Sequence, residues 1–286
     1  MRTAVFGLCG LIGLLVASPA WAQGINTNVA LPVARGEAIW RSQLRFVRAT
    51  DDPSPADREV STLVAPQTLV LGVTPRLTAF ATLPLLAHRR VASSSGTTRI
   101  DAAFGDVTLL GRYTLWWDDY APLSTRRVAL LGGVKLPTGA DRFGTRSLDP
   151  MFGAVATWAF DRHEVDLDAI YRVSTQRRGF RQGDGVRYDA AYRYRLWPAH
   201  FRGTQWQLNA LVELNGEWRD RDRKSGASVR SSGGSKLFVA PGLQLISKRW
   251  ILETSFQVPI VQDLKGTQLE QDFVAVLSFR VPFALP

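Results

Sequence analysis

The chain has 286 residues, of which 45% are hydrophobic, and its formal net charge is +10. This length and composition exclude a disordered polyelectrolyte, a collagen-like chain and a disulfide-stapled mini-protein. A mean hydropathy of -0.05 and 21% charged residues also exclude a bundle of membrane helices, since each such helix needs about 20 nearly uncharged residues.

The first 22 residues have the features of a secretory signal peptide. Arg2 supplies a positive charge, an apolar stretch runs to Val16, and the small-residue exit Ala20-Trp21-Ala22 follows. We predict cleavage after Ala22, and the alternative is an uncleaved N-terminal anchor helix. The only cysteine, Cys9, lies in this segment, so we expect the mature chain to lack disulfides, thiolate catalysis and cysteine metal sites.

From residue 38 onward, apolar and polar residues alternate with the period of two that is typical of β-strands. In residues 163–174, for example, Val165, Leu167 and Tyr171 alternate with Asp166 and Asp168. The pattern predicts twelve strands, at 38–48, 60–73, 77–87, 106–117, 127–137, 151–160, 163–174, 186–197, 205–215, 236–246, 250–260 and 272–283.

The connections between these strands alternate in length. The short ones are 74–76, 161–162, 198–203 and 247–249, and 118–125 is a turn of intermediate length that fits the alternation imperfectly. The long ones are 49–59, 88–102, 138–149, 175–185, 216–235 and 261–271. This alternation predicts an antiparallel up-and-down meander with its short turns at one end and its long loops at the other.

One face of each strand is apolar and the other is polar, which fits either a soluble sandwich or a membrane barrel. The strands are near the 9 to 11 residues that a tilted strand needs to cross a bilayer, and tryptophans cluster toward strand ends. The sequence therefore predicts an all-β fold, a transmembrane antiparallel barrel of about 12 strands formed by residues 38–286. Residues 23–37 are predicted to be an N-terminal periplasmic segment, and the location is the outer membrane of a Gram-negative bacterium.

Several short stretches carry a resemblance to a known family. They are Pro32–Glu37, Asp51–Pro55, Asp57–Glu59, Leu69–Leu77, Gly105–Thr108, Lys135–Gly139, Asp149–Pro150, Val239–Gln244 and Gln257–Leu264. Together they resemble the bacterial outer-membrane proteins grouped under a MetA pathway of phenol degradation, a transporter-like family. The resemblance covers most of the mature chain and implies a β-barrel that passes small organic, including aromatic, compounds.

The polar face of the strands predicts the residues that line the lumen. These are Arg41, Arg45, Arg112, Arg127, Lys135, Glu164, Asp166, Asp168, Arg172, Arg187, Asp189, Arg193, Arg195 and Glu213. Charged rings of this kind set ion selectivity and orient polar solutes. The alternative is that these charges pair with one another across strands and fill a narrow lumen.

An enzyme is the main competing hypothesis, because some outer-membrane barrels are hydrolases. The three histidines oppose it: in the predicted meander, His88 lies at the opposite end from His163 and His200, so they do not form one triad or metal site. A pair of His88 with Ser93, Ser94 or Ser95 is left as an alternative. We therefore expect no enzyme, no catalytic residue, no metal and no cofactor.

The expected function is a passive outer-membrane channel for small organic solutes, with a hydrolase or a structural or adhesive barrel as alternatives. The expected partners are membrane lipid, the barrel-assembly machinery and those solutes. Arginines in the long loops, such as Arg177, Arg178 and Arg223, suit the phosphates of lipopolysaccharide. No nucleic-acid partner is expected, because acidic residues interleave these arginines.

Overall fold

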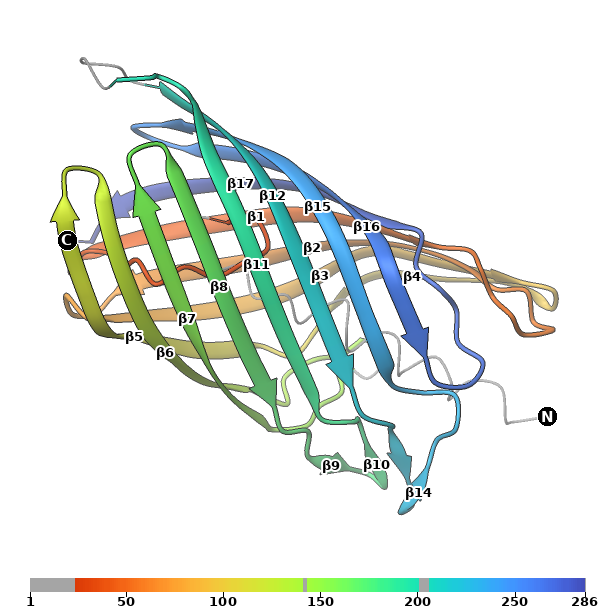
Figure 1. Ribbon diagram of the computed structural model, residues 1–286. Helices are drawn as coiled ribbons and strands as arrows, with labels where there is room; N and C mark the ends of the chain where they lie inside the picture. Colours follow the sequence, from red (N-terminus) through yellow and green to blue (C-terminus); the bar gives the residue numbers. More distant parts are fainter. Residues whose placement is uncertain (1–23, 141–142, 201–205, 286) are drawn as a thin grey trace.

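The computed structural model describes residues 24–140, 143–200 and 206–285. The predicted cleavage site after Ala22 lies outside these residues. The described residues form a 13-stranded sheet and a separate 4-stranded sheet (Figure 1). The strands of the large sheet are β1 (Glu37–Ala49), β2 (Glu59–Gly72), β3 (Leu77–Ser93), β4 (Gly96–Phe104), β5 (Thr108–Ala121), β6 (Ser124–Lys135), β7 (Asp149–Phe160), β8 (His163–Arg172), β11 (Gly185–Trp197), β12 (Trp206–Arg219), β15 (Gly234–Ser247), β16 (Ile251–Leu264) and β17 (Phe273–Ala284).

The large sheet closes on itself because the first and last strands pair. β1 and β17 are antiparallel from Glu37↔Ala284 to Arg48↔Phe273, and β1 also pairs with β2. Twelve of the thirteen strands form the closed ring. The remaining strand, β4, pairs only with β3 among the described strands. Each predicted strand overlaps one ring strand, so the all-β antiparallel barrel of about 12 strands is confirmed. Closure leaves no open sheet edge around the ring, as a bilayer requires.

The short turns and the long loops lie at opposite ends of the barrel. In Figure 1 the β5/β6 and β7/β8 hairpins and the C-terminus lie at one end, and β9, β10 and β14 lie at the other. The short turn from β2 to β3 is stabilised by one of its own side chains. Thr74 Oγ1 accepts hydrogen bonds from the backbone N–H groups of Arg76 (3.2 Å) and Leu77 (2.9 Å). We call the two ends the short-turn end and the long-loop end.

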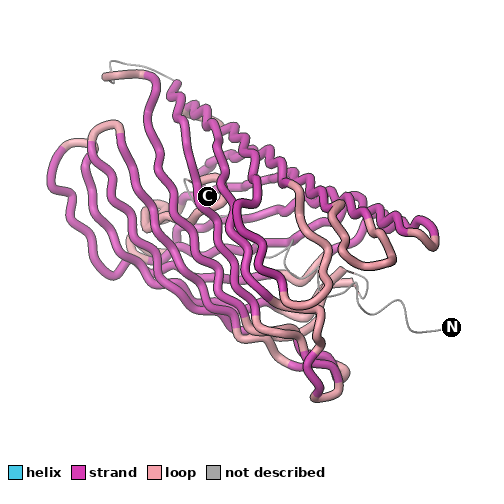
Figure 2. The backbone as a smooth tube through the Cα atoms, turned by 45° about the vertical axis from the view of Figure 1, so that its right-hand side comes forward, coloured by secondary structure: helices cyan, strands magenta, loops and turns pink. Residues whose placement is uncertain are grey.

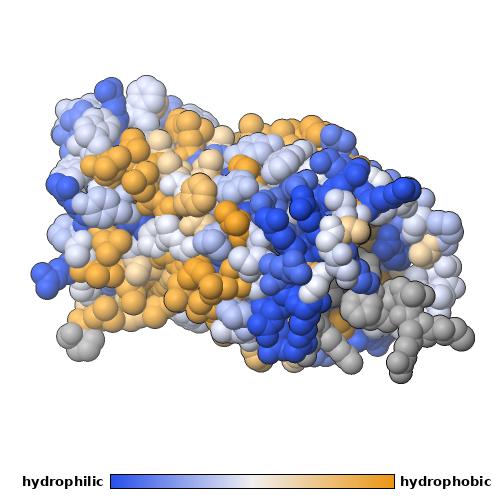
Figure 3. Space-filling model, turned by 90° about the horizontal axis from the view of Figure 1, so that it is seen from below, coloured by the Kyte–Doolittle hydropathy of each residue, from blue (hydrophilic) through white to orange (hydrophobic). Residues whose placement is uncertain are grey.

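Apolar side chains cover much of the outside of the barrel. Trp40, Leu44 and Phe46 of β1 are all exposed, as the alternation predicted. Figure 3 shows apolar residues over one part of the surface and hydrophilic residues gathered toward one end of the view. Exposed apolar residues on every second position of closed strands are typical of contact with lipid. The described residues contain no apolar helix long enough to cross a bilayer.

Aromatic residues gather at the short-turn end. Trp158 Nε1 donates a hydrogen bond to the Tyr120 hydroxyl at 2.9 Å, and the Arg126 guanidinium lies 4.5 Å from the Tyr120 ring. Elsewhere at this end of the barrel, Trp206 and Trp250 pack edge to face, with ring centroids 5.1 Å apart. Amphipathic rings of this kind occupy the membrane–water interface, so this end meets a bilayer surface.

The structure differs from the prediction in three of the long loops, 88–102, 175–185 and 216–235. Residues 88–102 were predicted to be a loop, but β3 continues to Ser93 and β4 pairs with it from Ser93↔Gly96 to Leu85↔Phe104. The loops around β9 (Gln176–Arg177), β10 (Phe180–Arg181), β13 (Arg223–Lys224) and β14 (Ala227–Ser228) form the 4-stranded sheet. Figure 2 shows strands and loops throughout. The strands β9, β10, β13 and β14 have only two residues each, which is too short for an alternation of apolar and polar residues to appear.

Candidate functional site

Charged side chains fill the inside of the barrel. On β8, Asp166 and Asp168 are 1% and 6% exposed, whereas Leu167 between them is 54% exposed. Eleven of the predicted lumen-lining residues are buried: Arg41, Arg45, Arg112, Lys135, Glu164, Asp166, Asp168, Arg172, Asp189, Arg195 and Glu213. Arg187 and Arg193 are half-buried, as is Arg127.

Many of these charges are bound to one another. Lys135 Nζ lies 2.6 Å from Asp149 Oδ2, and Arg187 Nη2 lies 3.2 Å from Asp168 Oδ1. Arg193 bonds to Glu164. The sequence left open whether the inward charges pair or form selectivity rings, and the structure contains extensive pairing across neighbouring strands.

Arg127 is brought to a different place from the rest of the set. Its Nη2 donates to the exposed carboxylate of Asp119 at 2.9 Å. Both residues are close to the turn between β5 and β6. Arg127 therefore lies at the short-turn rim rather than among the central charges.

The N-terminal residues enter the barrel. Residues 24–30 are buried, and residues 31–33 are half-buried. We call residues 24–33 the inner segment. The sequence predicted residues 23–37 as a periplasmic segment, but the inner segment lies inside the ring. Its sequence has no strand or helix period, so only the wall residues that contact it reveal its place.

Two wall carboxylates hold the first half of the inner segment. Glu213 Oε1 accepts hydrogen bonds from the backbone N–H groups of Asn26 (3.0 Å) and Thr27 (3.1 Å), and Oε2 accepts one from the Asn26 side chain at 2.6 Å. Asp168 accepts from the backbone N–H of Asn28 at 2.7 Å and from its side-chain amide at 2.9 Å. The carboxylates thus supply acceptors that a neighbouring strand would otherwise provide.

Three arginines hold the carbonyl groups of the same segment. Arg280 Nη2 donates to the Gly24 carbonyl at 2.9 Å, and Arg41 Nη2 donates to the Ile25 carbonyl at 2.6 Å. Arg112 Nη1 donates to the Val29 carbonyl at 2.6 Å, and its Nη2 donates to the Leu31 carbonyl.

The second half of the inner segment is held by hydroxyl groups. The backbone N–H groups of Ala30 and Val33 donate to Thr157 Oγ1 (2.8 Å) and Thr78 Oγ1 (3.2 Å). The chain then leaves the lumen past Gly72, where a Cβ atom would lie 1.9 Å from the Ala34 carbonyl oxygen. The inner segment therefore crosses the lumen from β17 and β12 to β3 without joining the sheet.

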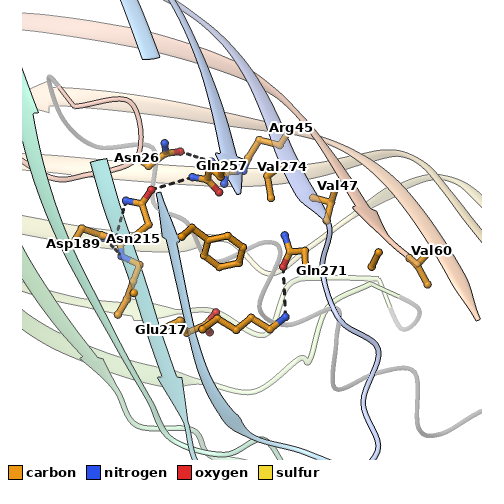
Figure 4. Close-up of a pocket in the computed structure, with 15 residues that line it drawn as sticks. Asn26, Arg45, Val47, Val60, Asp189, Asn215, Glu217, Gln257, Gln271 and Val274 are labelled. Carbon is orange, nitrogen blue, oxygen red and sulfur yellow. Dashed lines mark hydrogen bonds and ion pairs between the residues drawn. The ribbon is translucent and has the colours of Figure 1, made fainter. Parts of the chain in front are cut away.

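A cavity of about 90 Å³ lies toward the long-loop end of the inner segment (Figure 4), and we call it the long-loop cavity. Asn26 reaches it from the inner segment, and Val47 and Val60 reach it from β1 and β2. Amides organise its wall: Gln257 Nε2 donates to Asn215 Oδ1 at 3.2 Å, and Asn215 Nδ2 donates to Asp189 Oδ1 at 3.0 Å.

A larger cavity of about 300 Å³ lies toward the short-turn end, and we call it the short-turn cavity. The inner segment contributes Val29 and Leu31 to its lining. The barrel wall contributes Glu37, Ile39, Arg41, Val70, Phe80, Arg112 and Arg280. The inner segment therefore lies between two cavities of one lumen.

Several buried polar wall residues were not among the predicted set, and Glu253 and Arg280 are two charged examples. Glu253 and Arg280 bond to each other, with Arg280 Nη2 2.6 Å from Glu253 Oε1. Both lie on inward positions, since Leu252 and Phe279 beside them are exposed. The alternation rule applied to the last two strands would have found them.

The histidines are separated as predicted. His88 on β3 bonds to Asp101 on β4, and both are exposed. His163 Nδ1 lies 2.7 Å from the Tyr192 hydroxyl at the short-turn end. Among the described residues, no group of three or more histidine, cysteine or acidic side chains is arranged to hold a metal ion.

A closed antiparallel barrel with an apolar exterior and a charged interior defines the class of transmembrane β-barrels. Residues 56–262 match the family described as "Putative MetA-pathway of phenol degradation", and the chain belongs to this family. The resemblance inferred from the sequence is confirmed. No curated protein matches the chain.

Solved structures share the fold. The COG4313 outer membrane channel from Pseudomonas putida F1 is 16% identical, with a TM-score of 0.69, and the match covers 89% of this chain and 98% of that one. The beta domain of the Bordetella autotransporter BrkA is 10% identical, with a TM-score of 0.51 and coverage of 87% and 100%. At these identities the likeness concerns the barrel fold alone.

Proposed function

We propose that this protein is an outer-membrane channel for small organic solutes, and that its inner segment must move for solutes to pass. The observation that carries the proposal is the inner segment itself, which separates two cavities and is held by side chains rather than by a strand ladder. The described hydrogen bonds that hold it to the wall are made by individual wall side chains. The segment can therefore leave without breaking the strand pairing of the barrel.

The family match and the likeness to an outer membrane channel support this function rather than an enzyme. We place the long loops outside the cell and the short turns in the periplasm, because short turns are periplasmic in bacterial outer-membrane barrels. The loop arginines are then available to lipopolysaccharide phosphates.

The test weakens the hold on the inner segment. The double change Glu213→Ala and Asp168→Ala removes both carboxylates that bind Asn26, Thr27 and Asn28. Hydrogen bonds to charged groups contribute about 1.5–3 kcal/mol each, so we expect the open population to rise at least about tenfold. The readouts are single-channel conductance and the swelling rate of liposomes in a neutral solute.

The matched control is Asp189→Ala, which removes another buried inward carboxylate. Asp189 accepts from Asn215 at 3.0 Å and lies 2.8 Å from Arg187, and these contacts do not involve the inner segment. We expect near-wild-type flux in the control. If the folded double variant passes no more solute than the wild type, the inner segment does not control passage.

A further inference from the structure

The short-turn cavity combines apolar surface with arginine side chains. Ile39, Val70 and Phe80 give one wall an apolar character, and Val70 and Phe80 belong to a buried apolar cluster. The guanidinium of Arg112 lies 5.1 Å from the centre of the Phe80 ring. A ligand in this cavity would therefore contact a hydrophobic surface and a cation at once.

The residues that line the cavity include three arginines and one acidic residue, the exposed Glu37 at the start of β1. Arg280 takes both oxygens of Glu253, with distances of 2.9 Å and 2.6 Å. Arg41 faces Arg280 in the β1–β17 register and reaches the same Glu253 at 3.4 Å. One carboxylate therefore serves two buried guanidinium groups.

Arg112 brings a third guanidinium, whose described hydrogen bonds go to the carbonyls of Val29 and Leu31. The negative charge of Asp166 attracts Arg112 electrostatically. The described hydrogen bond to Asp166 Oδ1, however, comes from the Thr157 hydroxyl. Among the arginines that line this cavity, two buried N–H groups, Arg112 Nε and Arg41 Nη1, have no hydrogen-bond partner. Both side chains are nearly fully buried, at 3% and 1% exposure.

An unmatched buried cation is costly, and so is a buried N–H group without an acceptor. A bound anion would reduce the cost of the unmatched positive charge, and a volume of about 300 Å³ is at the small end of the range for small-molecule pockets. We propose that the short-turn cavity binds small carboxylic acids with an apolar or aromatic body. The carboxylate accepts from the arginines, and the body lies against Phe80, Val70 and Ile39.

This inference rests on the proposed channel function and names its solute class. Other classes fit less well. A neutral ring compound of the same size leaves the guanidinium charge unmatched, an organic cation is repelled by it, and a very short acid leaves the apolar wall uncovered. The four classes can therefore be ranked in one binding experiment.

The experiment measures binding to the purified full-length protein in detergent micelles by equilibrium dialysis. The probes are benzoate, benzyl alcohol, benzylamine and acetate. We expect benzoate to bind at least about tenfold more tightly than each of the others, which is the ratio that one charge-assisted contact supplies. Equal binding of benzoate and benzyl alcohol overturns the proposal.

Two variants test the place of binding. Val70→Asp puts a carboxylate into the cavity, which satisfies the arginines and repels the probe, so benzoate binding should be lost. Arg112→Gln should weaken benzoate at least about tenfold and weaken benzyl alcohol less than benzoate. The control is Arg48→Gln, which removes an equal charge from a residue that pairs with Glu59 outside the cavity. If benzoate binds Val70→Asp as tightly as it binds the wild type, the benzoate site lies elsewhere and the proposal fails.

Folding and function are checked separately. Heat-modifiable gel mobility reports whether each variant is a folded barrel, and contacts between the benzoate ring and the Val70 and Ile39 methyl groups are sought by NMR in the wild type. Contacts to these methyls support the site even if a variant does not fold, and their absence overturns it. If neutral solutes pass but benzoate does not bind, this inference is wrong and the channel proposal is unaffected. If benzoate binds but no solute passes, the channel proposal is wrong.

Discussion

Leu167 and Asp168 are neighbours on β8 that meet opposite surroundings. Leu167 is exposed on the outer surface, while both oxygens of Asp168 are bonded, to Asn28 of the inner segment and to Arg187 of β11. Because successive side chains of a strand point to opposite faces, one step along the chain changes the environment from lipid to a charged interior.

At Leu167 we expect a charged substitution to be costly. Leu167→Arg places a guanidinium in the apolar belt near the middle of β8 and should lower the free energy of unfolding by about 2–4 kcal/mol. Urea unfolding in lipid vesicles measures the effect. Leu167→Ile, which keeps the site apolar, should change little, and equal stability of the two variants would contradict the outward orientation of this residue.

At the scale of elements, the loop of residues 50–58 is organised by one carboxylate. Asp52 Oδ2 accepts from Arg58 Nε at 2.6 Å and from the Ser54 hydroxyl at 2.8 Å, and Oδ1 accepts from the Ser54 backbone N–H at 3.1 Å. The hydrogen bond from the Arg58 side chain is the main cause that holds the pKa of Asp52 well below its usual range. The same pairing raises the pKa of Arg58.

This shift predicts how the loop responds to acid. The folded pKa of Asp52 is below the unfolded value of about 3.9, so the bonded carboxylate stabilises the loop above about pH 4 and this contribution is lost as pH falls further. We expect the amide protection of residues 54–58, measured by hydrogen exchange against an unfolded reference, to be unchanged between about pH 4 and 7.

The matching variants separate this carboxylate from general loop charge. Asp52→Asn should lower the protection at every pH, because an amide cannot hold Arg58 by an ion pair. Asp51→Asn, beside it in the same loop, should leave the protection intact. A fall in wild-type protection between pH 7 and 5 would show that another group controls the loop.

At the scale of the whole molecule, the even number of ring strands places the start of the first strand beside the end of the last strand. Glu37 at the start of β1 pairs with Ala284 at the end of β17, so the barrel begins and finishes at the short-turn end. The 4-stranded sheet lies at the other end, and its β13–β14 hairpin turns at Gly226, which has φ +86° and open space around it. An insertion there disturbs no packed atom.

This arrangement predicts which insertions can be reached from outside the cell. An epitope inserted at Gly226 should bind antibody on intact cells, whereas one inserted in the short turn at Asp161 should bind only after permeabilisation. Flow cytometry distinguishes the two. The reverse pattern would mean that the short turns, rather than the long loops, face outward.

The sequence by itself determined the ring strands, their order along the chain and the faces that they present. Residues such as Leu167 and Asp168 could be assigned to opposite faces, because strand periodicity is local and every residue carries its own polarity. The same local rule located most of the charged interior. It also extends to Glu253 and Arg280, which lie on inward positions of the last two ring strands.

Only the tertiary structure decided what occupies the lumen. Asn26 and Asn28 carry no periodic signal, and their place follows from Glu213 and Asp168, which lie 140 residues or more away along the chain. Nor could the sequence tell that Arg112 would face carbonyl groups while Lys135 faces a carboxylate. Which groups meet across a closed ring depends on the register and closure of all its strands, and no local pattern contains that information.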